Sequence, residues 1–348
     1  MLKDNVTLKN KTVLITGCAG FIGYHLCEYI LNNEPDTKVV GLDCLNNYYD
    51  ISLKLKRLNN LEKHKSKKWF FVRSDISNMD SLMTVFIEYK PDIVVNLAAQ
   101  AGVRYSITNP DTYIQNNVFG FYNILECCRK YPVEHLVYAS SSSVYGGNEK
   151  LPYSTDDKVD NPVSLYAATK KSNELFAHCY SKLYNIPTTG LRFFTVYGPY
   201  GRPDMAYFSF TNKLKNGDKI QIFNYGKCKR DFTYIDDIVE GVYRVMKHYP
   251  EKHENNGVPY KVYNIGNSNP ENLLDFVRIL QEELTERGVL PKDYDFDAHM
   301  ELVPMQPGDV ESTFADTKPL EDDFGFKPNT KLKDGLKKFV KWYSEYYA

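Results

Sequence analysis

The sequence lacks the cysteine and histidine spacings that mark most disulfide frameworks and metal sites. Its seven cysteines and seven histidines form no Cys-x-x-Cys and no His-x-x-x-His pair, and the number of cysteines is odd. These absences predict reduced thiols and no metal site.

Strong charge and long apolar runs are also missing. A net charge of -1 over 348 residues provides no global basic surface for nucleic acid or an anionic membrane. No stretch approaches the roughly 20 apolar residues of a membrane span, and residues 1–10 have no apolar signal core. We therefore expect a cytoplasmic protein with no nucleic-acid or membrane partner.

Apolar strands alternate with amphipathic helices through the first half of the chain. The pattern predicts strands at 11–16, 38–43, 69–72, 93–97, 136–140 and 187–194, and helices at 21–33, 79–90, 111–130 and 164–184. Such alternation indicates a parallel sheet covered on both faces, so we expect an α/β fold with a Rossmann-type doubly wound sheet.

A glycine-rich loop, Gly17-Cys-Ala-Gly20-Phe21-Ile22-Gly23, joins the first expected strand to the first helix. Gly17 permits a tight turn, Gly20 lets the backbone approach a pyrophosphate, and Gly23 lets the helix pack against the sheet. The helix N-terminus then faces the phosphates. The loop predicts a dinucleotide site.

An acidic residue follows at the expected distance. Asp43 ends the second predicted strand, where a carboxylate can bind both adenosine ribose hydroxyls. A 2′-phosphate would meet a like charge there, which favours NAD over NADP. Further cofactor contacts are expected after the third and fourth strands, at Asp75, Ile76, Leu97, Ala98 and Ala99. For Asp75, helix capping is an open alternative.

A Tyr-x-x-x-Lys pattern begins at Tyr166, Tyr225 and Tyr243, but only the first follows the serine run 140–143 on a long predicted helix. Oxidising an alcohol requires a base at its oxygen. A phenol has a pKa of about 10, and a cationic lysine at i+4 favours the phenolate. We therefore predict Tyr166 as the base and Lys170 as its activator, with the other two pairs on the surface.

Longer motifs carry a resemblance to a family. The glycine spacing, the turn at 96–101 and the serine run before Tyr166 resemble the extended short-chain dehydrogenase/reductase family, and within it the nucleotide-sugar 4-epimerases. The resemblance covers about residues 11–344. Segments 98–106, 162–171 and 195–205 resemble the subgroup that acts on UDP-glucuronate and yields UDP-galacturonate. It implies NAD regenerated in each cycle, a transient 4-keto sugar, a role in supplying surface polysaccharide, and a homodimer formed through the helices near 111–130 and 164–184.

The resemblance also implies roles for individual residues. Ser141 would bond the sugar oxygen beside Tyr166, with Ser142 and Ser143 next to it at the open end of a strand. Thr195 and Arg202 would face sugar carbon 6, where an arginine–carboxylate pair selects a uronate. The expected substrate-binding residues are Arg104, Ser141, Thr195, Arg202, Phe223, Arg230 and Asp309. Tyr225 is a further candidate beside the uracil ring.

Several alternatives stay open. Ser143 precedes Val144-Tyr-Gly146 where related decarboxylases typically carry glutamate, which favours epimerisation. The other open functions are epimerisation of UDP-N-acetylglucosamine or UDP-glucose, decarboxylation of UDP-glucuronate, and a binding module whose site has decayed. Arg202 has a surface ion pair with Asp204 as its alternative. For Arg230 the alternative partners are Asp231 and Asp236, and Asp309 can be a simple turn residue.

The regular alternation ends near residue 197, and shorter elements with more Pro, Asn and Lys follow. We expect residues 1–195 to form the NAD-binding domain with the Tyr166 helix. Residues 196–348 would form mainly a smaller α/β domain that binds the UDP-sugar, with some chain returning to the first sheet. The Lys/Asn-rich stretches 54–68 and 247–257 are interpreted as solvated surface.

Overall fold

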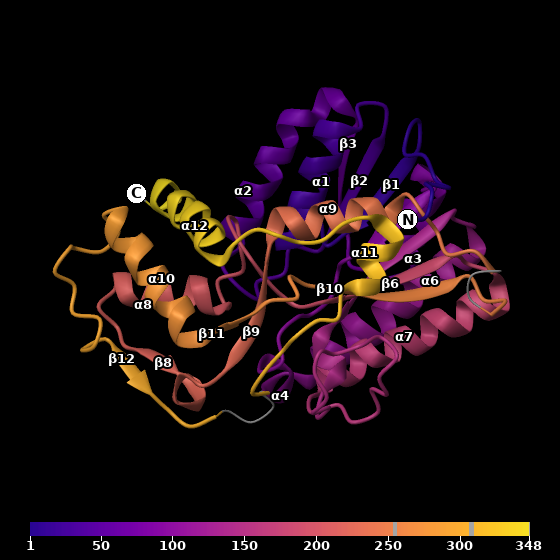
Figure 1. Cartoon of the computed structure of the whole chain (residues 1–348). Helices are drawn as coiled ribbons and strands as arrows, with labels where there is room; N and C mark the ends of the chain where they lie inside the picture. The colour runs from indigo at the N-terminus through magenta and orange to yellow at the C-terminus, as the bar shows by residue number, and fades with distance from the viewer. Residues whose placement is uncertain (253–255, 306–309, 348) are drawn as a thin grey trace.

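The computed structural model describes residues 1–252, 256–305 and 310–347. A seven-stranded parallel sheet runs through these residues in the order β10-β6-β5-β4-β1-β2-β3 (Figure 1). Its strands are β1 (Thr12–Thr16), β2 (Lys38–Asp43), β3 (Trp69–Arg73), β4 (Ile93–Asn96), β5 (His135–Ser141), β6 (Thr188–Phe193) and β10 (Tyr260–Ile265). The predicted Rossmann-type sheet is confirmed.

Both faces of the sheet are buried, because consecutive strand residues point to opposite sides. Val13 and Ile15 of β1 belong to one apolar cluster, and Leu14 between them belongs to the other. The helices that cover these faces are α1 (Phe21–Asn33), α2 (Ile51–Leu61), α3 (Met79–Tyr89), α6 (Gly120–Lys130), α7 (Leu165–Tyr184), α9 (Ile235–Met246) and α11 (Lys318–Phe324). Helices α1 and α9 contribute to the apolar cluster of Val13 and Ile15, and α3, α6 and α7 to that of Leu14.

The predicted helix 111–130 is interrupted. Two short helices, α4 (Tyr105–Thr108) and α5 (Pro110–Tyr113), come first, and a wider π-helical turn (Ile114–Phe119) joins α5 to α6. Sequence periodicity does not distinguish this turn from an ordinary helix. Such turns occur mainly where a helix is adapted to a site.

The elements after β6, other than α9, β10 and α11, lie to the left in Figure 1 and form the second portion of the chain. It holds two small sheets, ordered β11-β9-β7 and β12-β8, and an apolar aromatic cluster that includes Phe208, Phe339 and Trp342. Its strands are β7 (Thr195–Tyr197), β8 (Ile220–Ile222), β9 (Lys229–Tyr234), β11 (Pro270–Asn272) and β12 (Met300–Leu302), and its helices are α8 (Ala206–Lys215), α10 (Leu273–Glu286) and α12 (Leu332–Tyr346). Single turns of 3-10 helix lie at Glu62–Lys67, Ser142–Tyr145 and Phe223–Gly226.

The interpretation of 54–68 and 247–257 as solvated surface is wrong at several positions. Lys54 is 5% exposed and Arg57 is fully buried. The Arg57 guanidinium donates to the carbonyl of Ala19, at 2.7 Å, and to that of Tyr200, at 2.6 Å. It therefore ties the glycine loop to the segment after β7. His248 in the second stretch is also buried.

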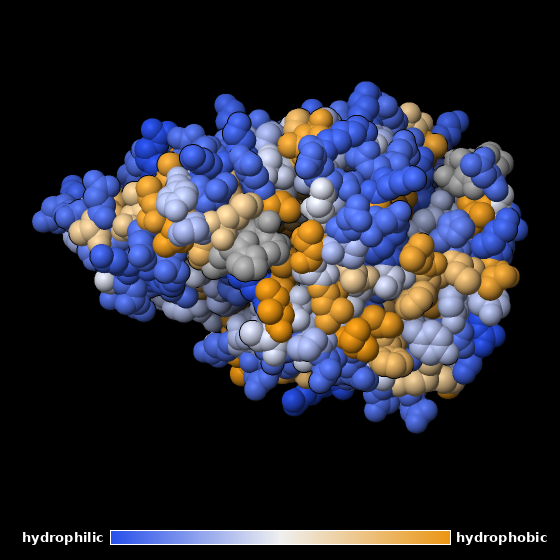
Figure 2. Space-filling model, turned by 90° about the horizontal axis from the view of Figure 1, so that it is seen from below, coloured by the Kyte–Doolittle hydropathy of each residue, from blue (hydrophilic) through white to orange (hydrophobic). Residues whose placement is uncertain are grey.

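Apolar side chains are exposed on the outer faces of α6 and α7. Tyr122 of α6 and Leu175, Phe176 and Leu183 of α7 are 36–65% exposed. Figure 2, which views the molecule from below, shows apolar side chains gathered over the region where α7 lies. Contiguous apolar surface of this kind commonly marks a protein interface.

Candidate active site

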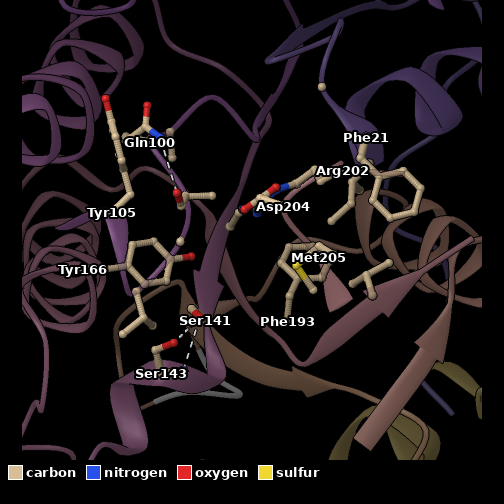
Figure 3. A pocket seen from close by; sticks show the side chains of 18 of the residues that line it. Phe21, Gln100, Tyr105, Ser141, Ser143, Tyr166, Phe193, Arg202, Asp204 and Met205 are labelled. Atoms are coloured by element: carbon tan, nitrogen blue, oxygen red, sulfur yellow. Dashed lines mark hydrogen bonds and ion pairs between the residues drawn. The ribbon is translucent and has the colours of Figure 1, made fainter. Parts of the chain in front are cut away.

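A cavity of about 670 Å³ opens between the carboxyl ends of the main strands and the second portion of the chain (Figure 3). Ligands bind at this end of parallel α/β sheets. Apart from Tyr225, every predicted site residue within the described ranges lines the cavity. Asp309 lies outside the described residues.

The glycine loop approaches neighbouring backbone more closely than any side chain permits. Gly17 has a φ of +71°, and a Cβ on it would lie 2.8 Å from the Ala98 nitrogen. A Cβ on Gly23 would lie 2.2 Å from the Gly17 carbonyl oxygen. Helix α1 begins after Gly20 with no side-chain cap. Its N-terminus is therefore open to an anionic group.

The carboxylate of Asp43 is anchored at the end of β2. Its Oδ2 accepts the Ala19 N–H at 3.1 Å and its Oδ1 accepts the Leu45 N–H at 2.8 Å. Each carboxylate oxygen can accept more than one hydrogen bond, so acceptor capacity remains for ribose hydroxyls in the cavity. An uncapped helix, a closely packed glycine loop and this acid together fit a dinucleotide.

Asp75 lines the cavity just after the end of β3. Its Oδ1 accepts the Ser77 N–H at 2.8 Å, whereas the side chain that caps α3 is Asn78, which accepts the Ser81 N–H at 3.0 Å. Asp75 therefore stabilises a turn beside the cavity instead of capping the helix.

Tyr166 lies in the first turn of α7, which Ser164 begins by accepting the Ala167 N–H at 3.1 Å. Figure 3 shows the phenol oxygen directed into the cavity on the side of Ser141. Burial raises the pKa of Tyr166, while a hydrogen bond with Ser141 and the charge of Arg202 act to lower it. The phenol of Tyr166, the hydroxyl of Ser141 and the guanidinium of Arg202 thus lie in the same cavity.

Lys170 is 3% exposed and its Nζ donates to the Ala139 carbonyl at 2.9 Å. Burial lowers the pKa of Lys170 to about 8. Arg202 is the cation whose charge acts to lower the pKa of Tyr166. The activating role of Lys170 stays a prediction.

The serines divide into two groups. The Ser141 hydroxyl donates to Ser143 Oγ at 3.1 Å and accepts the Ser143 N–H at 3.2 Å, on the cavity wall. Ser140 instead donates to the buried carboxylate of Glu174 at 2.7 Å. Glu174 in turn pairs with Arg192, which fixes α7 to the end of β6. Ser140 therefore has a structural partner.

Asn117 is a residue that the sequence analysis missed. It sits in the π-helical turn before α6, is 1% exposed, and its Oδ1 accepts the Gln100 N–H at 2.8 Å. Its Nδ2 donates to Thr169 Oγ1 on α7 at 3.1 Å. It thereby connects the turn after β4 to the helix of Tyr166. An asparagine inside an expected helix, where its propensity is poor, was the available signal.

The far wall of the cavity carries the predicted substrate residues. Thr195 begins β7, and the Arg104 guanidinium lies over the Phe223 ring, 5.0 Å from its centroid. Tyr225 is 51% exposed and is not among the residues that line the cavity, so the structure does not support a place for it beside the uracil. The pair Tyr243/Lys247 also lies away from the cavity.

Arg230 and Arg202 both line the cavity. Arg230 Nη1 donates to the Lys229 carbonyl at 2.9 Å and to the Glu311 carbonyl at 3.1 Å. Arg202 Nε donates to Asp204 Oδ1 at 3.0 Å, so the ion pair considered as an alternative exists, but it lies on the cavity wall. The sequence analysis missed Tyr48, whose hydroxyl donates to Asp204 Oδ2 at 3.1 Å.

Other kinds of site were also sought in the described ranges. They contain no cluster of three or more His, Cys, Asp or Glu side chains suited to a metal ion. None of the helices in these ranges is long and apolar enough to cross a membrane. All seven cysteines are free.

Comparison with known proteins identifies the family. The model of the NAD dependent epimerase/dehydratase family matches residues 13–266. The chain belongs to this family. Among curated relatives, Protein CapI of Staphylococcus aureus is 50% identical over 96% of this chain and 99% of its own length. UDP-glucuronate 4-epimerase 4 of Arabidopsis thaliana is 45% identical over 97% of this chain and 76% of its own length.

A solved structure of the family is similar over nearly its whole length. UDP-glucuronic acid 4-epimerase from Bacillus cereus, in complex with UDP-glucuronic acid and NAD, matches with a TM-score of 0.84 and 32% identity, covering 97% of this chain and 100% of that one. These comparisons confirm the predicted family, the NAD cofactor and the enzyme class, a nucleotide-sugar 4-epimerase.

Proposed function

We propose that the enzyme interconverts UDP-glucuronate and UDP-galacturonate through a transient 4-keto sugar. The observation that carries this proposal is the presence of Tyr166 and Arg202 in one cavity, a potential base and a cation suited to a sugar carboxylate. Names of relatives point the same way: the Arabidopsis and Bacillus proteins are UDP-glucuronate 4-epimerases.

The proposed chemistry begins at the sugar hydroxyl on carbon 4. Tyr166, as the phenolate, takes its proton, and Ser141 donates a hydrogen bond to the same oxygen, which stabilises the negative charge that develops there as the proton leaves. NAD, when bound, would supply the redox chemistry, taking up a hydride from carbon 4 and giving it back. Lys170, one helical turn further along α7, would hold the nicotinamide ribose and favour the phenolate electrostatically.

Inversion requires the keto sugar to turn over while its nucleotide stays bound. Arg230 suits the diphosphate because its guanidinium is permanently charged and bidentate, and Phe223 offers a flat face to the uracil. Asp309 is proposed as a ribose ligand. Arg202 and Thr195 hold the carboxylate on carbon 6. The 4-keto uronate is a β-keto acid, which loses carbon dioxide when the bond to its carboxylate aligns with the π system of the ketone. A clamp that holds the carboxylate away from this alignment also prevents that loss.

The alternative functions, decarboxylation of UDP-glucuronate and epimerisation of a neutral UDP-sugar, fit less well with Ser143 and Arg202. A decarboxylase would benefit from an acid where Ser143 stands, and a neutral sugar would leave Arg202 without a substrate carboxylate. Both observations favour uronate epimerisation over the alternatives.

We also propose how the chain is organised and assembled. Residues 1–195 bind NAD and residues 196–348 mainly bind the UDP-sugar, with β10 contributing to the main sheet. The exposed apolar faces of α6 and α7 (Figure 2) support a homodimer in which these helices pair across a two-fold axis. Sedimentation of the wild type against Leu175→Glu tests the interface, and an unchanged dimer contradicts it.

The substrate proposal is tested by incubating the purified enzyme with UDP-glucuronate and separating the sugar nucleotides. We expect UDP-galacturonate and no UDP-pentose. Parallel incubations with UDP-glucose and UDP-N-acetylglucosamine should give little product. Formation of a UDP-pentose, or faster turnover of a neutral sugar, would overturn the proposal.

A further inference from the structure

Three residues that meet on the substrate wall come from distant parts of the chain. Tyr48 lies in the loop after β2, five residues beyond the cofactor acid Asp43, whereas Arg202 and Asp204 follow β7. The hydrogen bond between Tyr48 and Asp204 spans 156 positions of sequence. It therefore joins the loop on the cofactor side of the cavity to the loop on the sugar side.

The contact between Asp204 and Arg202 uses a particular edge of the guanidinium. Nε donates to Asp204 Oδ1 at 3.0 Å, and Nη2 donates to Asp204 Oδ2. A guanidinium presents its five N–H groups in a planar fork. With one carboxylate on the Nε/Nη2 edge, the two N–H groups of the Nη1/Nη2 edge, which point in parallel, are still able to receive a second carboxylate. Asp204 thus orients Arg202 without using its whole donor set.

The neighbouring loop is shaped around this cluster. A Cβ on Gly102, where φ is +103°, would lie 3.1 Å from the Tyr48 hydroxyl and 3.7 Å from Arg202 Nη2. The Tyr48 ring also packs against Tyr105, with centroids 4.8 Å apart. A glycine at position 102 therefore leaves room for Tyr48 and Arg202, and the Tyr105 ring supports the Tyr48 phenol from one side.

The strength of the ion pair itself does not explain this arrangement. The side chains of Arg202 and Asp204 are 22% and 31% exposed, and partly exposed pairs contribute only about 0–1 kcal/mol to stability. Burial disfavours the charge on Asp204, but Arg202 outweighs it and the pKa of Asp204 is lowered. Both groups are therefore charged. Because the pair adds little to stability, its main effect is to orient the Arg202 guanidinium.

We propose that Asp204, held in turn by Tyr48, is a positioning residue that aims the free edge of Arg202 at the sugar carboxylate. This inference rests on the proposed function and deepens it. Tyr48 and Asp204 thereby become determinants of uronate selectivity, although neither needs to touch the sugar. A neutral hexose gains nothing from the oriented edge, so the effect is specific for substrates with a carboxylate on carbon 6.

The test measures kcat and KM for UDP-glucuronate, and the affinity for UDP, in NAD-loaded wild type, Asp204→Asn and Tyr48→Phe. We expect Asp204→Asn to raise KM about tenfold or more, because a charge-assisted bond worth about 1.5–3 kcal/mol is misdirected, with kcat changed less than about threefold. Tyr48→Phe should act in the same direction by a smaller factor. Affinity for UDP should stay unchanged in both.

Matched controls separate positioning from general damage. Tyr243→Phe removes a hydrogen bond from tyrosine to Glu34, and Asp275→Asn removes a carboxylate from Arg278, both outside the cavity. Neither should change KM. If Asp204→Asn is unstable, Tyr48→Phe still decides the question.

The outcomes are distinct. An unchanged KM in Asp204→Asn and Tyr48→Phe, tighter binding of UDP-glucuronate, or an equal loss of UDP affinity would overturn the positioning role while leaving uronate epimerisation intact. A wild type that turns over only neutral UDP-sugars would overturn the proposed function and this inference together.

Discussion

The cofactor side and the substrate side of the cavity are built in different ways. On the cofactor side, backbone groups of the glycine loop and one carboxylate, Asp43, converge from β1, β2 and α1, which are adjacent in sequence. On the substrate side, long side chains such as Arg202 and Arg230 reach in from loops and short strands far apart in sequence. The cofactor side thus depends on backbone geometry, and the substrate side on the orientation of side chains.

Tyr166 stands between the two sides, and replacing it should have the largest effect. Tyr166→Phe removes the proposed base, so kcat should fall by about 10²–10⁴-fold. NAD and UDP affinities should stay within about twofold of wild type, because neither wall is altered. Steady-state kinetics and titration calorimetry measure both. Turnover near the wild-type level would remove Tyr166 from the mechanism.

Arg202→Ala should weaken substrate binding and leave NAD binding unchanged. Losing a charge-assisted pair worth about 1.5–3 kcal/mol predicts a 10- to 100-fold rise in KM for UDP-glucuronate. The preference over UDP-glucose should weaken, and some UDP-pentose should appear as the clamp is lost. Product ratios by chromatography check this. Full activity with full preference would show that Arg202 is no clamp.

Asp43→Ala should affect only the cofactor side. The loss of ribose hydrogen bonds predicts roughly tenfold weaker NAD binding, while UDP affinity stays the same. Because Asp43 also accepts two backbone N–H groups, Asp43→Asn is the milder companion variant. Equal weakening of NAD binding and UDP binding would mean that the cofactor side and the substrate side do not act independently.

Asp231 offers a smaller test on the substrate side, through pH. Its carboxylate accepts the N–H groups of Asn267, Ser268 and Ala315, and burial raises its pKa from 3.8 to about 6. The folded state therefore binds more protons between about pH 4 and 6, and this stabilisation is lost as pH rises through 6.

Urea unfolding of the wild type and Asp231→Asn at pH 4.5 and pH 7 measures this effect. The wild type should lose, relative to the variant, about 2 kcal/mol between these pH values. If the stability difference between wild type and Asp231→Asn is the same at both pH values, the raised pKa of Asp231 is contradicted.

The two sides also differ in how far the sequence predicts them. Helix α1 was predicted at 21–33 and is found at Phe21–Asn33, because a glycine loop, a strand and an acid at fixed spacing specify a local unit. Tyr48 was not singled out, and Asp204 was considered only as a surface partner of Arg202, since the contact between Tyr48 and Asp204 spans 156 positions. The burial of Arg57 was missed for the same reason: its partners Tyr200 and Gly201 lie more than 140 positions away. The predicted substrate residues came from resemblance to a family.

Retention of the hydrogen on carbon 4 tests the central claim most directly. UDP-glucuronate carrying deuterium at that carbon is incubated with the enzyme, and the product is analysed by NMR spectroscopy and mass spectrometry. The account predicts UDP-galacturonate that retains the deuterium at carbon 4, because one carbon is oxidised and reduced within the same site. Loss of the deuterium to solvent, or a product without its carboxylate, would contradict it.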